Sequence, residues 1–562
     1  MGINELLAEK VRIDGKFLVN DPALVLFKKD WAKVEYSWFE YEEKALQVMK
    51  GLKGRNLKAG EFVAIIALNL PESFFALLGA ILMGAIPVPI NYLLLKNEGG
   101  KEELKKILDD CRPSLILANQ SLKKMLPKPE SEYCIPIEQI IQEGKEALAG
   151  RLAGKNNCPE PRHPSIPIHP RKPQEMLIMP YTSGTTGKPK GVMLSEEGVL
   201  DRAVAVLGYY RASHRERVPS YLPLGHISEL IATFFGQLYG GYTVYFTEHI
   251  EKRLTDAEKL LEIFPLFLQR VMSTIFLGVP NVWINFQNGI KKKLNKIPLI
   301  SQIISQLRKF KPFNNLVTKM IKNKLGFPST RVFITAAAPP DQIDLAFYRN
   351  LDIAIDDIYG QTEVCGPILV NGEPIGNVQV WIGSQNNKIT VEGPCVMLGY
   401  YKNPEATSKV IQGVTLSNGE TRRVYCTGDL GRKNDAGKIF YDGRQDEGGK
   451  GGNGEYYSAS KLFEVEKEIK KIEGVAEVVF VFEGRPFLTA LIFHQDDAVQ
   501  NSLKIHINIR KCLDRIGEGF YKVKRFKVLS KKELILTPTM KVKKKATIER
   551  FKELTDQMYE EN

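Results

Sequence analysis

A short segment rich in glycine, hydroxyl groups and lysine carries the clearest chemical signal in the sequence. Residues 181–191 read YTSGTTGKPKG; the apolar run MLIM precedes them and the helical pattern VMLSEEGVLDRAVAVL follows. In such a turn the backbone N–H groups form a nest for an anion, hydroxyl groups donate hydrogen bonds, and lysines neutralise charge. The segment therefore predicts a polyphosphate-binding loop. The residues expected to contribute are Thr182, Ser183, Gly184, Thr185, Thr186, Gly187 and Lys188.

The spacing of this loop differs from that of ordinary P-loop NTPases. Their motif places four residues between its glycines and follows its lysine with serine or threonine. Here two threonines separate Gly184 from Gly187, and Pro189 follows Lys188. The loop is therefore not a Walker motif.

Further segments with chemically useful residues follow along the chain. They are LPLGHISE (222–229), AAAPP (336–340), YGQTE (359–363), YCTGD (425–429), DGRQDE (442–447) and LTPTMKVKKK (536–545). With residues 181–191, this ordered series closely resembles the adenylate-forming superfamily, which contains acyl-CoA synthetases, luciferases, aryl-CoA ligases and adenylation domains of peptide synthetases. The resemblance covers nearly the whole chain.

The resemblance implies a nucleotide site built mainly from YGQTE. Tyr359 would stack on adenine, Thr362 would hold the α-phosphate, and Glu363 would bind Mg²⁺, which prefers hard oxygen ligands. Further contacts to the nucleotide are implied for Gly360 and Ala338, and Thr185 is implied as a second Mg²⁺ contact.

Two further segments resemble the ribose site and the hinge of the superfamily. Asp429 would accept hydrogen bonds from both ribose hydroxyls, with Arg444 as its partner at the same sugar. Asp446 falls at the hinge position, where a change in one residue's dihedral angles lets the C-terminal domain swing.

The resemblance also supplies residues for the chemical step. His226 would flank the incoming carboxylate, and Lys541 would bridge this carboxylate and the α-phosphate during adenylation. An ammonium group suits that role because two anions must approach each other there. The neighbouring Lys543, Lys544 and Lys545 are interpreted as a solvated basic face.

What the resemblance implies is a ligase that uses ATP, Mg²⁺ and CoA. A carboxylate would attack ATP to give acyl-AMP and pyrophosphate, and a thiol would then displace AMP. The segment TIFLGVPNVWINF and the basic insert after it look most like the long-chain fatty acyl-CoA synthetase branch, so a fatty acid is the expected acid. The acyl chain is expected near residues 225–240 and 275–283.

One stretch departs from the superfamily pattern. After the hinge, residues 447–454 read EGGKGGNG where an apolar strand with a lysine is usual, so the thioester step is supported less directly than adenylation. Three alternatives stay open: a fatty acyl-AMP ligase that passes the acyl group to a carrier protein, a synthetase for aryl or medium-chain acids, and a nucleotide-binding sensor or lipid-binding module without ligase activity.

The elements that must position these residues follow an α/β pattern. Strand-like runs, among them FVAIIAL, SLILA, YTVYF and RVFITAAA, alternate with segments of helical spacing. Near residue 447 the sequence pattern changes, and a charged helical segment, two apolar strand-like runs and a lysine-rich end follow. We therefore expect a large α/β domain over residues 1–445, with mixed and parallel sheets, and a small mobile α+β domain over residues 446–562.

Much of the positive charge of the chain lies in one segment. The chain of 562 residues has a net charge of +13. Residues 263–340 contain twelve Lys and Arg and no acid, and apolar residues recur there at helical spacing. This pattern predicts basic amphipathic helices over residues 291–324, either as a solvated face or as a surface for an anionic membrane. No nucleic acid partner is expected, and a homodimer is a candidate assembly.

Two observations bear on location. The seven cysteines are scattered without a CxxC pair, and no export signal is visible, so we expect the cytoplasm, with the inner face of a membrane as a peripheral location. Residues 73–95 contain no charged residue, but Pro87 and Pro89 divide them. This stretch is therefore predicted to form a buried helix followed by a strand rather than a membrane span.

Overall fold

The computed structural model separates the chain into two compact units. The first comprises Met1–Gln379 and Val391–Tyr425, and the second Val380–Thr390 and Cys426–Asn562. The structure describes residues 2–3, 21–152, 169–183, 188–252, 257–295, 311–336, 343–384, 387–415, 421–452, 454–495, 503–516, 519–536 and 542–560. The division predicted from the change in sequence pattern, with domains over residues 1–445 and 446–562, stays a prediction.

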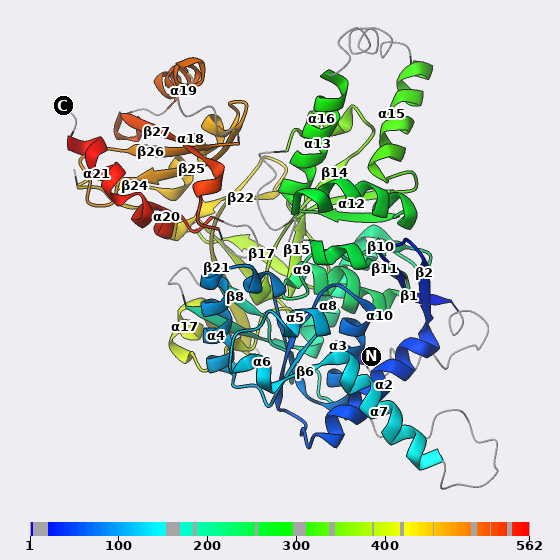
Figure 1. The fold of residues 1–562 in the computed structure, drawn as a ribbon. Coiled ribbons are helices and arrows are strands. Elements are labelled where there is room, and N and C mark those ends of the chain that lie inside the picture. Colours follow the sequence, from blue (N-terminus) through cyan, green and yellow to red (C-terminus); the bar gives the residue numbers. More distant parts are fainter. Residues whose placement is uncertain are drawn as a thin grey trace. The chain divides into compact units, whose positions relative to one another are not determined.

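The α/β architecture predicted for the large part is confirmed in the first unit (Figure 1). A parallel sheet has the order β4 (Ile86–Ile90), β3 (Phe62–Ile66), β5 (Leu115–Ala118) and β6 (Cys134–Pro136). The stretch of chain that forms this sheet also contains the helices α2 (Trp38–Gly54), α3 (Pro71–Met83), α4 (Glu98–Cys111) and α7 (Ile137–Leu152). Parallel strands covered by helices are apolar on both faces, which explains the continuous apolar runs in the sequence.

The uncharged stretch before Lys96 folds as predicted. It forms α3, which begins with proline at its first turn and ends at Gly84 with φ of 85°, and then the strand β4. Pro87 and Pro89 lie within β4, an edge strand, where a missing N–H group is tolerated. Of the helices that the structure describes, none is long and apolar enough to cross a membrane.

Three more sheets of the first unit carry the segments with chemical residues. One has the order β12 (Ile275–Gly278), β13 (Val332–Thr335), β14 (Ile355–Gln361), β15 (Gly366–Val370) and β16 (Glu373–Pro374). A second has the order β10 (Arg217–Pro219), β11 (Thr243–Thr247), β1 (Pro22–Phe27) and β2 (Lys33–Ser37). The third joins β19 (Gly399–Tyr400), β9 (Pro189–Ser195) and β7 (Met176–Ile178), and β8 (Tyr181–Ser183) also pairs with β9.

Helices complete the first unit. They include α8 (Glu196–Tyr210), α12 (Ala257–Val271), α13 (Pro280–Asn295) and α15 (Lys311–Leu325). The last two fall on the predicted basic amphipathic segment, and α15 contacts α12. Helix formation in that part of the insert is therefore confirmed.

The second unit contains the expected α+β body (Figure 1). Its sheet has the order β25 (Val475–Val481), β26 (Thr489–His494) and β27 (Arg525–Ser530), with α18 (Ala459–Lys470), α19 (Leu503–Arg515), α20 (Lys544–Arg550) and α21 (Lys552–Glu560). The unit also contains the end of β21 (Thr421–Lys433), its antiparallel partner β22 (Ile439–Arg444), the 3₁₀ turn η6 (Gln445–Glu447) and the hairpin strands β23 (Gly449–Lys450) and β24 (Tyr456–Tyr457).

Candidate active site

Two antiparallel strands hold the segment rich in glycine and hydroxyl groups. β8 and β9 pair Thr182 with Lys190 and Ser183 with Pro189, so the chain reverses direction between them. Lys188 is exposed immediately before β9. Gly184, Thr185, Thr186 and Gly187 lie outside the described residues, as does the side chain of Ser183, and their phosphate contacts stay predictions.

The base of this loop is fixed by a half-buried tyrosine. The Tyr181 hydroxyl donates a hydrogen bond of 2.5 Å to a carboxylate oxygen of Asp110 on α4. Burial, together with this hydrogen bond, raises the pKa of Tyr181 well above its ordinary value, so the hydroxyl stays protonated as a donor. Gly191 pairs with Tyr181 across the strands, and a Cβ there would lie 3.0 Å from the tyrosine ring. The strands can therefore pack closely because residue 191 has no side chain.

The strand after the loop is connected to Glu363 through Tyr400. β19 pairs with β9 and places Tyr400 beside Val192. The Tyr400 hydroxyl donates to Glu363 Oε1 over 3.0 Å, and Lys190 Nζ lies 4.9 Å from the centroid of the Tyr400 ring, within cation–π range. The contribution of Tyr400 could not be predicted from the sequence, because it arises from the pairing of β9 with β19.

The YGQTE segment forms a tight turn between β14 and β15. A Cβ on Gly360 would lie 2.0 Å from the carbonyl oxygen of Gly366, so the irregular pairing at this point requires glycine. Gln361 Oε1 accepts a hydrogen bond of 2.8 Å from the Tyr425 hydroxyl, and the Glu363 carbonyl accepts one of 2.9 Å from Met397 N–H. Tyr359, Thr362 and Glu363 are half-buried on this one turn.

His226 caps the short helix α9 (Ile227–Glu229). Its Nδ1 accepts a hydrogen bond of 3.2 Å from the backbone N–H of Ser228. A ring nitrogen that accepts carries no proton, so the neutral ring carries its proton on Nε2. The turn of YGQTE lies close by, since a Cβ on Gly366 would meet the side chains of Ile231 and Ile227, at 3.2 and 3.6 Å.

A buried carboxylate, that of Glu229, holds the segment around His226. Glu229 Oε1 accepts hydrogen bonds from Asn69 Nδ2 at 3.0 Å, Ser220 Oγ at 2.5 Å and Thr233 Oγ1 at 3.1 Å. Its Oε2 accepts from the backbone N–H of Leu222 at 3.2 Å, and the residue is 1% exposed. No role was predicted for Glu229, although a carboxylate inside an apolar segment is a signal in the sequence.

The predicted ribose pair forms within the second unit. Asp429 on β21 lies opposite Arg444 on β22, and Arg444 Nε lies 3.1 Å from Asp429 Oδ1. Asp429 is 2% exposed, and its N–H donates to Thr427 Oγ1 over 3.1 Å. Gly428 has φ of 75°, which leaves the backbone beside Asp429 in a conformation that favours glycine.

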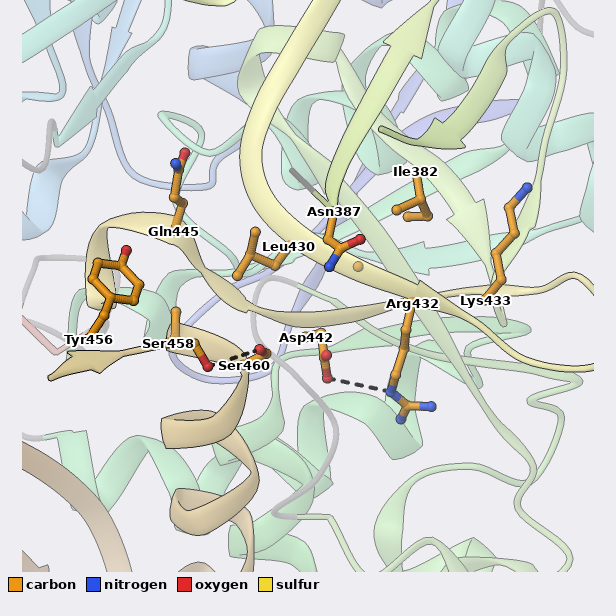
Figure 2. Close-up of a pocket in the computed structure, with 12 residues that line it drawn as sticks. Ile382, Asn387, Leu430, Arg432, Lys433, Asp442, Gln445, Tyr456, Ser458 and Ser460 are labelled. Atoms are coloured by element: carbon orange, nitrogen blue, oxygen red, sulfur yellow. Dashed lines mark hydrogen bonds and ion pairs between the residues drawn. The ribbon is translucent and has the colours of Figure 1, made fainter. Parts of the chain in front are cut away.

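The predicted hinge residue is exposed beside a cavity in the second unit. Figure 2 shows this cavity, which has a volume of about 720 Å³. Its lining includes Gln445 of η6, together with Arg432, Lys433 and Tyr456. Asp446, the next residue after Gln445, is exposed.

The lysine-rich end differs in part from its interpretation. Lys541 lies outside the described residues, as does Ala338, and both roles stay predictions. Lys544 was interpreted as part of a solvated basic face, and this is wrong. Its Nζ lies 3.0 Å from Glu447 Oε2 and 3.0 Å from Glu466 Oε2, because the chain folds α20 against η6 and α18.

Comparisons with known proteins show which family the chain resembles. A model of the family described as "AMP-binding enzyme" matches residues 17–401. The long-chain-fatty-acid–CoA ligase ACSBG1 of Rattus norvegicus is 24% identical over 643 aligned positions, which cover 96% of this chain and 84% of the relative. The ligase ACSBG2 of Gallus gallus is 24% identical, with coverage of 94% and 78%.

Solved structures have the same fold. The O-succinylbenzoate CoA synthetase of Bacillus subtilis in complex with AMP is 20% identical with a TM-score of 0.67, covering 96% of this chain and 97% of its own. The anthranilate CoA ligase AuaEII in complex with anthranoyl-AMP is 18% identical with a TM-score of 0.71, covering 99% and 97%. At these identities the likeness establishes the fold.

The Glu229 network generates a prediction about the first unit. Glu229→Ala should lower its free energy of unfolding by about 2–5 kcal/mol, because buried donors lose their acceptor. The measurement is denaturation followed by tryptophan fluorescence, because three of the four tryptophans, Trp31, Trp38 and Trp283, lie in this unit, and only Trp381 lies in the second. The exposed Glu102→Ala on α4 is the control, with a change within about 0.5 kcal/mol. Equal effects of the two substitutions would contradict the role of the network.

Proposed function

Because the chain belongs to the AMP-binding enzyme family, we propose that it is an ATP-dependent ligase that activates a long-chain fatty acid and transfers the acyl group to CoA. One arrangement carries the proposal. The turn of Tyr359, Thr362 and Glu363 is joined through Tyr400 to the strand that follows the glycine- and hydroxyl-rich loop. Groups suited to adenine, phosphate and a divalent cation therefore gather in the first unit.

In the first step, a carboxylate oxygen of the acid would attack the α-phosphorus of ATP. The bond from this phosphorus to the bridging oxygen breaks, and pyrophosphate leaves with the electron pair. His226 supports this assignment, because the proton on Nε2 can be donated to an anionic oxygen while Ser228 holds Nδ1. Lys541 is assigned the bridging of the two anions, which lowers their repulsion in the transition state.

Glu363 is assigned to Mg²⁺. Its carboxylate is half-buried and held by the Tyr400 hydroxyl, and such an oxygen ligand fits the preference of this ion. A bound Mg²⁺ would neutralise phosphate charge, and Thr185 is its second assigned contact. Asp429 and Arg444 are assigned to the ribose, with Gly360 and Ala338 as further nucleotide contacts.

In the second step, the thiol of CoA would attack the acyl carbonyl and displace AMP, and the thiol proton passes to solvent. The unusual glycine-rich segment bears on this step. It leads into the hairpin β23–β24, where Gly451 N–H donates to the backbone carbonyl of Glu455 over 2.9 Å. Gly452 N–H donates to the backbone carbonyl of Arg485 over 2.8 Å. The family resemblance implies an apolar strand at this place in the sequence. Because this chain has a glycine-rich hairpin instead, CoA is a less direct inference, and a carrier protein is the alternative acceptor.

A fatty acid is favoured as the acid because the curated relatives carry the name long-chain-fatty-acid–CoA ligase. The segments expected to line the acyl chain are strongly apolar. Residues 275–283 contribute Phe276 and Trp283 to a buried aromatic cluster, and their rings lie 5.3 Å apart. Aryl or medium-chain acids are the alternative substrates.

A carboxylate panel tests the reaction class. With ATP and palmitate the protein should release pyrophosphate and, when CoA is added, form a thioester. Octanoate and benzoate are the comparison acids, and each reaction is measured for AMP and for thioester. Pyrophosphate release without a thioester would favour the acyl-AMP ligase. No release with any acid would contradict the ligase and favour a binding module.

Lys541→Ala separates the two steps. Adenylation should fall by a factor of about 10² or more, because the bridging ammonium group is lost, whereas thioester formation from supplied acyl-AMP should be largely retained. Pyrophosphate exchange and thioester formation are the two measurements. Lys545→Ala is the matched control. Unchanged adenylation in Lys541→Ala would show that another lysine performs this role.

We also propose that the basic insert binds an anionic membrane surface, which would place a cytoplasmic enzyme at the inner face of a membrane. In the described part of α15, Lys319 and Lys324 are exposed, and Met320 is 53% exposed between them. Exposed lysines around an exposed apolar side chain suit the interface of an anionic bilayer.

Flotation with vesicles tests this surface. The protein should float with vesicles containing anionic lipid, and salt should release it. The double substitution Lys319→Glu with Lys324→Glu should reduce the bound fraction at least tenfold. Lys105→Glu with Lys106→Glu, at exposed positions of α4, changes the net charge equally and should have little effect. Equal losses of vesicle binding in both variants would contradict the proposal and indicate that residues 291–324 form a solvated face.

A further inference from the structure

A chain of alternating charges runs through the second unit. Lys544, the first residue of α20, lies between two carboxylates, that of Glu447 in η6 and that of Glu466 on α18, at 3.0 Å from each. Lys470, also on α18, lies 2.5 Å from Glu466 and 2.5 Å from Glu477 on β25. Five charged side chains therefore connect η6, α20, α18 and β25.

The middle of this chain is deeply buried. The side chains of Glu466 and Lys470 are 8% and 11% exposed. Burial would raise the pKa of Glu466, but the positive charges of Lys470 and Lys544 outweigh burial and hold the pKa below its ordinary value. Glu466 is therefore ionised at neutral pH and strongly attracts both lysines. Lys544 accordingly has a fixed position that exposed lysines lack.

The residues just before Lys544 form the base of the segment that contains Lys541. Leu536 and Val542 form an isolated antiparallel bridge, and Lys543 N–H donates to the carbonyl of Ile535 over 2.8 Å. Ile535 N–H in turn donates to Thr547 Oγ1 on α20 over 3.4 Å. Residues 535–536 and 542–543 are therefore fastened to each other and to α20.

The other partner of Lys544 lies beside the predicted hinge. In η6, Gln445 lines the cavity of Figure 2, Asp446 is exposed, and Glu447 turns to Lys544. Successive side chains of a 3₁₀ turn point in different directions, which allows these three environments. Thus the residue that follows the hinge position is bound to the helix that follows Lys541.

We propose that Lys544 is a positioning residue that makes the base of the Lys541 segment move as one body with the chain that follows the hinge. The proposal rests on the proposed function for its catalytic consequence. A rotation of the backbone at Asp446 would first displace Glu447. The ion pair between Glu447 and Lys544 would then displace α20 and residues 535–543 together with it. Without this ion pair, Lys541 would be delivered with less precise geometry, and adenylation would suffer more than the thioester step.

Hydrogen exchange tests the tether directly and does not depend on activity. In Lys544→Gln, amide exchange should rise at least fivefold both in peptides covering residues 445–447 and in peptides covering residues 535–543. Lys545→Gln removes an equal charge from an exposed neighbour and should change neither. Lys544→Arg can still bind two carboxylates and should restore protection. A rise in only one of the two regions, or in neither, would overturn the proposal.

Half-reactions test the catalytic consequence. Lys544→Gln should slow acyl-AMP formation at least tenfold, with the KM for ATP and for the acid changed less than threefold. Thioester formation from supplied acyl-AMP should change less than threefold, and Lys544→Arg should recover most of the loss. Equal losses in both half-reactions would indicate general destabilisation and would overturn the positioning role.

Glu447→Gln provides a second variant if Lys544→Gln does not fold. It weakens the hinge side of the chain of charges and leaves Lys544 bound to Glu466. It should reproduce the exchange and the loss of adenylation, and normal behaviour would contradict the proposal. If the wild-type protein forms no acyl-AMP with any acid, the proposed function fails, while hydrogen exchange still decides whether the tether exists.

Discussion

The site in the first unit depends on the demand of one buried carboxylate for hydrogen bonds. Glu229 is almost inaccessible to water, so its two oxygens need donors from the protein. The donors come from Asn69 after β3, from Ser220 and Leu222 after β10, and from Thr233 one turn further along the helix. Satisfying this one group therefore fixes three chain segments together, and His226 lies on the loop between them.

The two units use buried polar groups in different ways. Around Glu229 the hydrogen-bond donors are neutral groups. They belong to the chain segments that hold His226 in place. In the second unit, lysines and glutamates alternate through Lys544, Glu466 and Lys470. Ion pairs of this kind constrain geometry more than they add stability, since burial offsets much of their attraction. They suit a body that must keep its internal arrangement when it moves.

The sequence predicted where helices and strands form better than it predicted which of them pair or which side chains meet. Apolar runs identified β3 and β13 because strands buried on both faces need continuous apolar residues, and similar runs identified the partly buried β5 and β11. Pro87 and Pro89 marked where α3 had to end. The structure places Asp429 opposite Arg444, as a shared role would require, but the roles of this pair and of the YGQTE turn stay predictions. Tyr400 was missed because its role arises from the pairing of β19 with β9. Lys544 was misinterpreted because a run of lysines does not show which one faces a carboxylate.

The position of two prolines in β4 also determines which backbone groups its outer edge presents to the rest of the unit. In this parallel strand Ile86 N–H donates toward β3, so Pro87 and Pro89 face the outer edge, where the Pro87 carbonyl accepts from Met179 N–H. At these two positions the outer edge offers carbonyl oxygens but no N–H groups. The segment around Met179 covers this edge, and all five residues of β4 are buried. The edge is therefore closed by the unit's own chain, and the two prolines leave no backbone N–H group there that would need an acceptor.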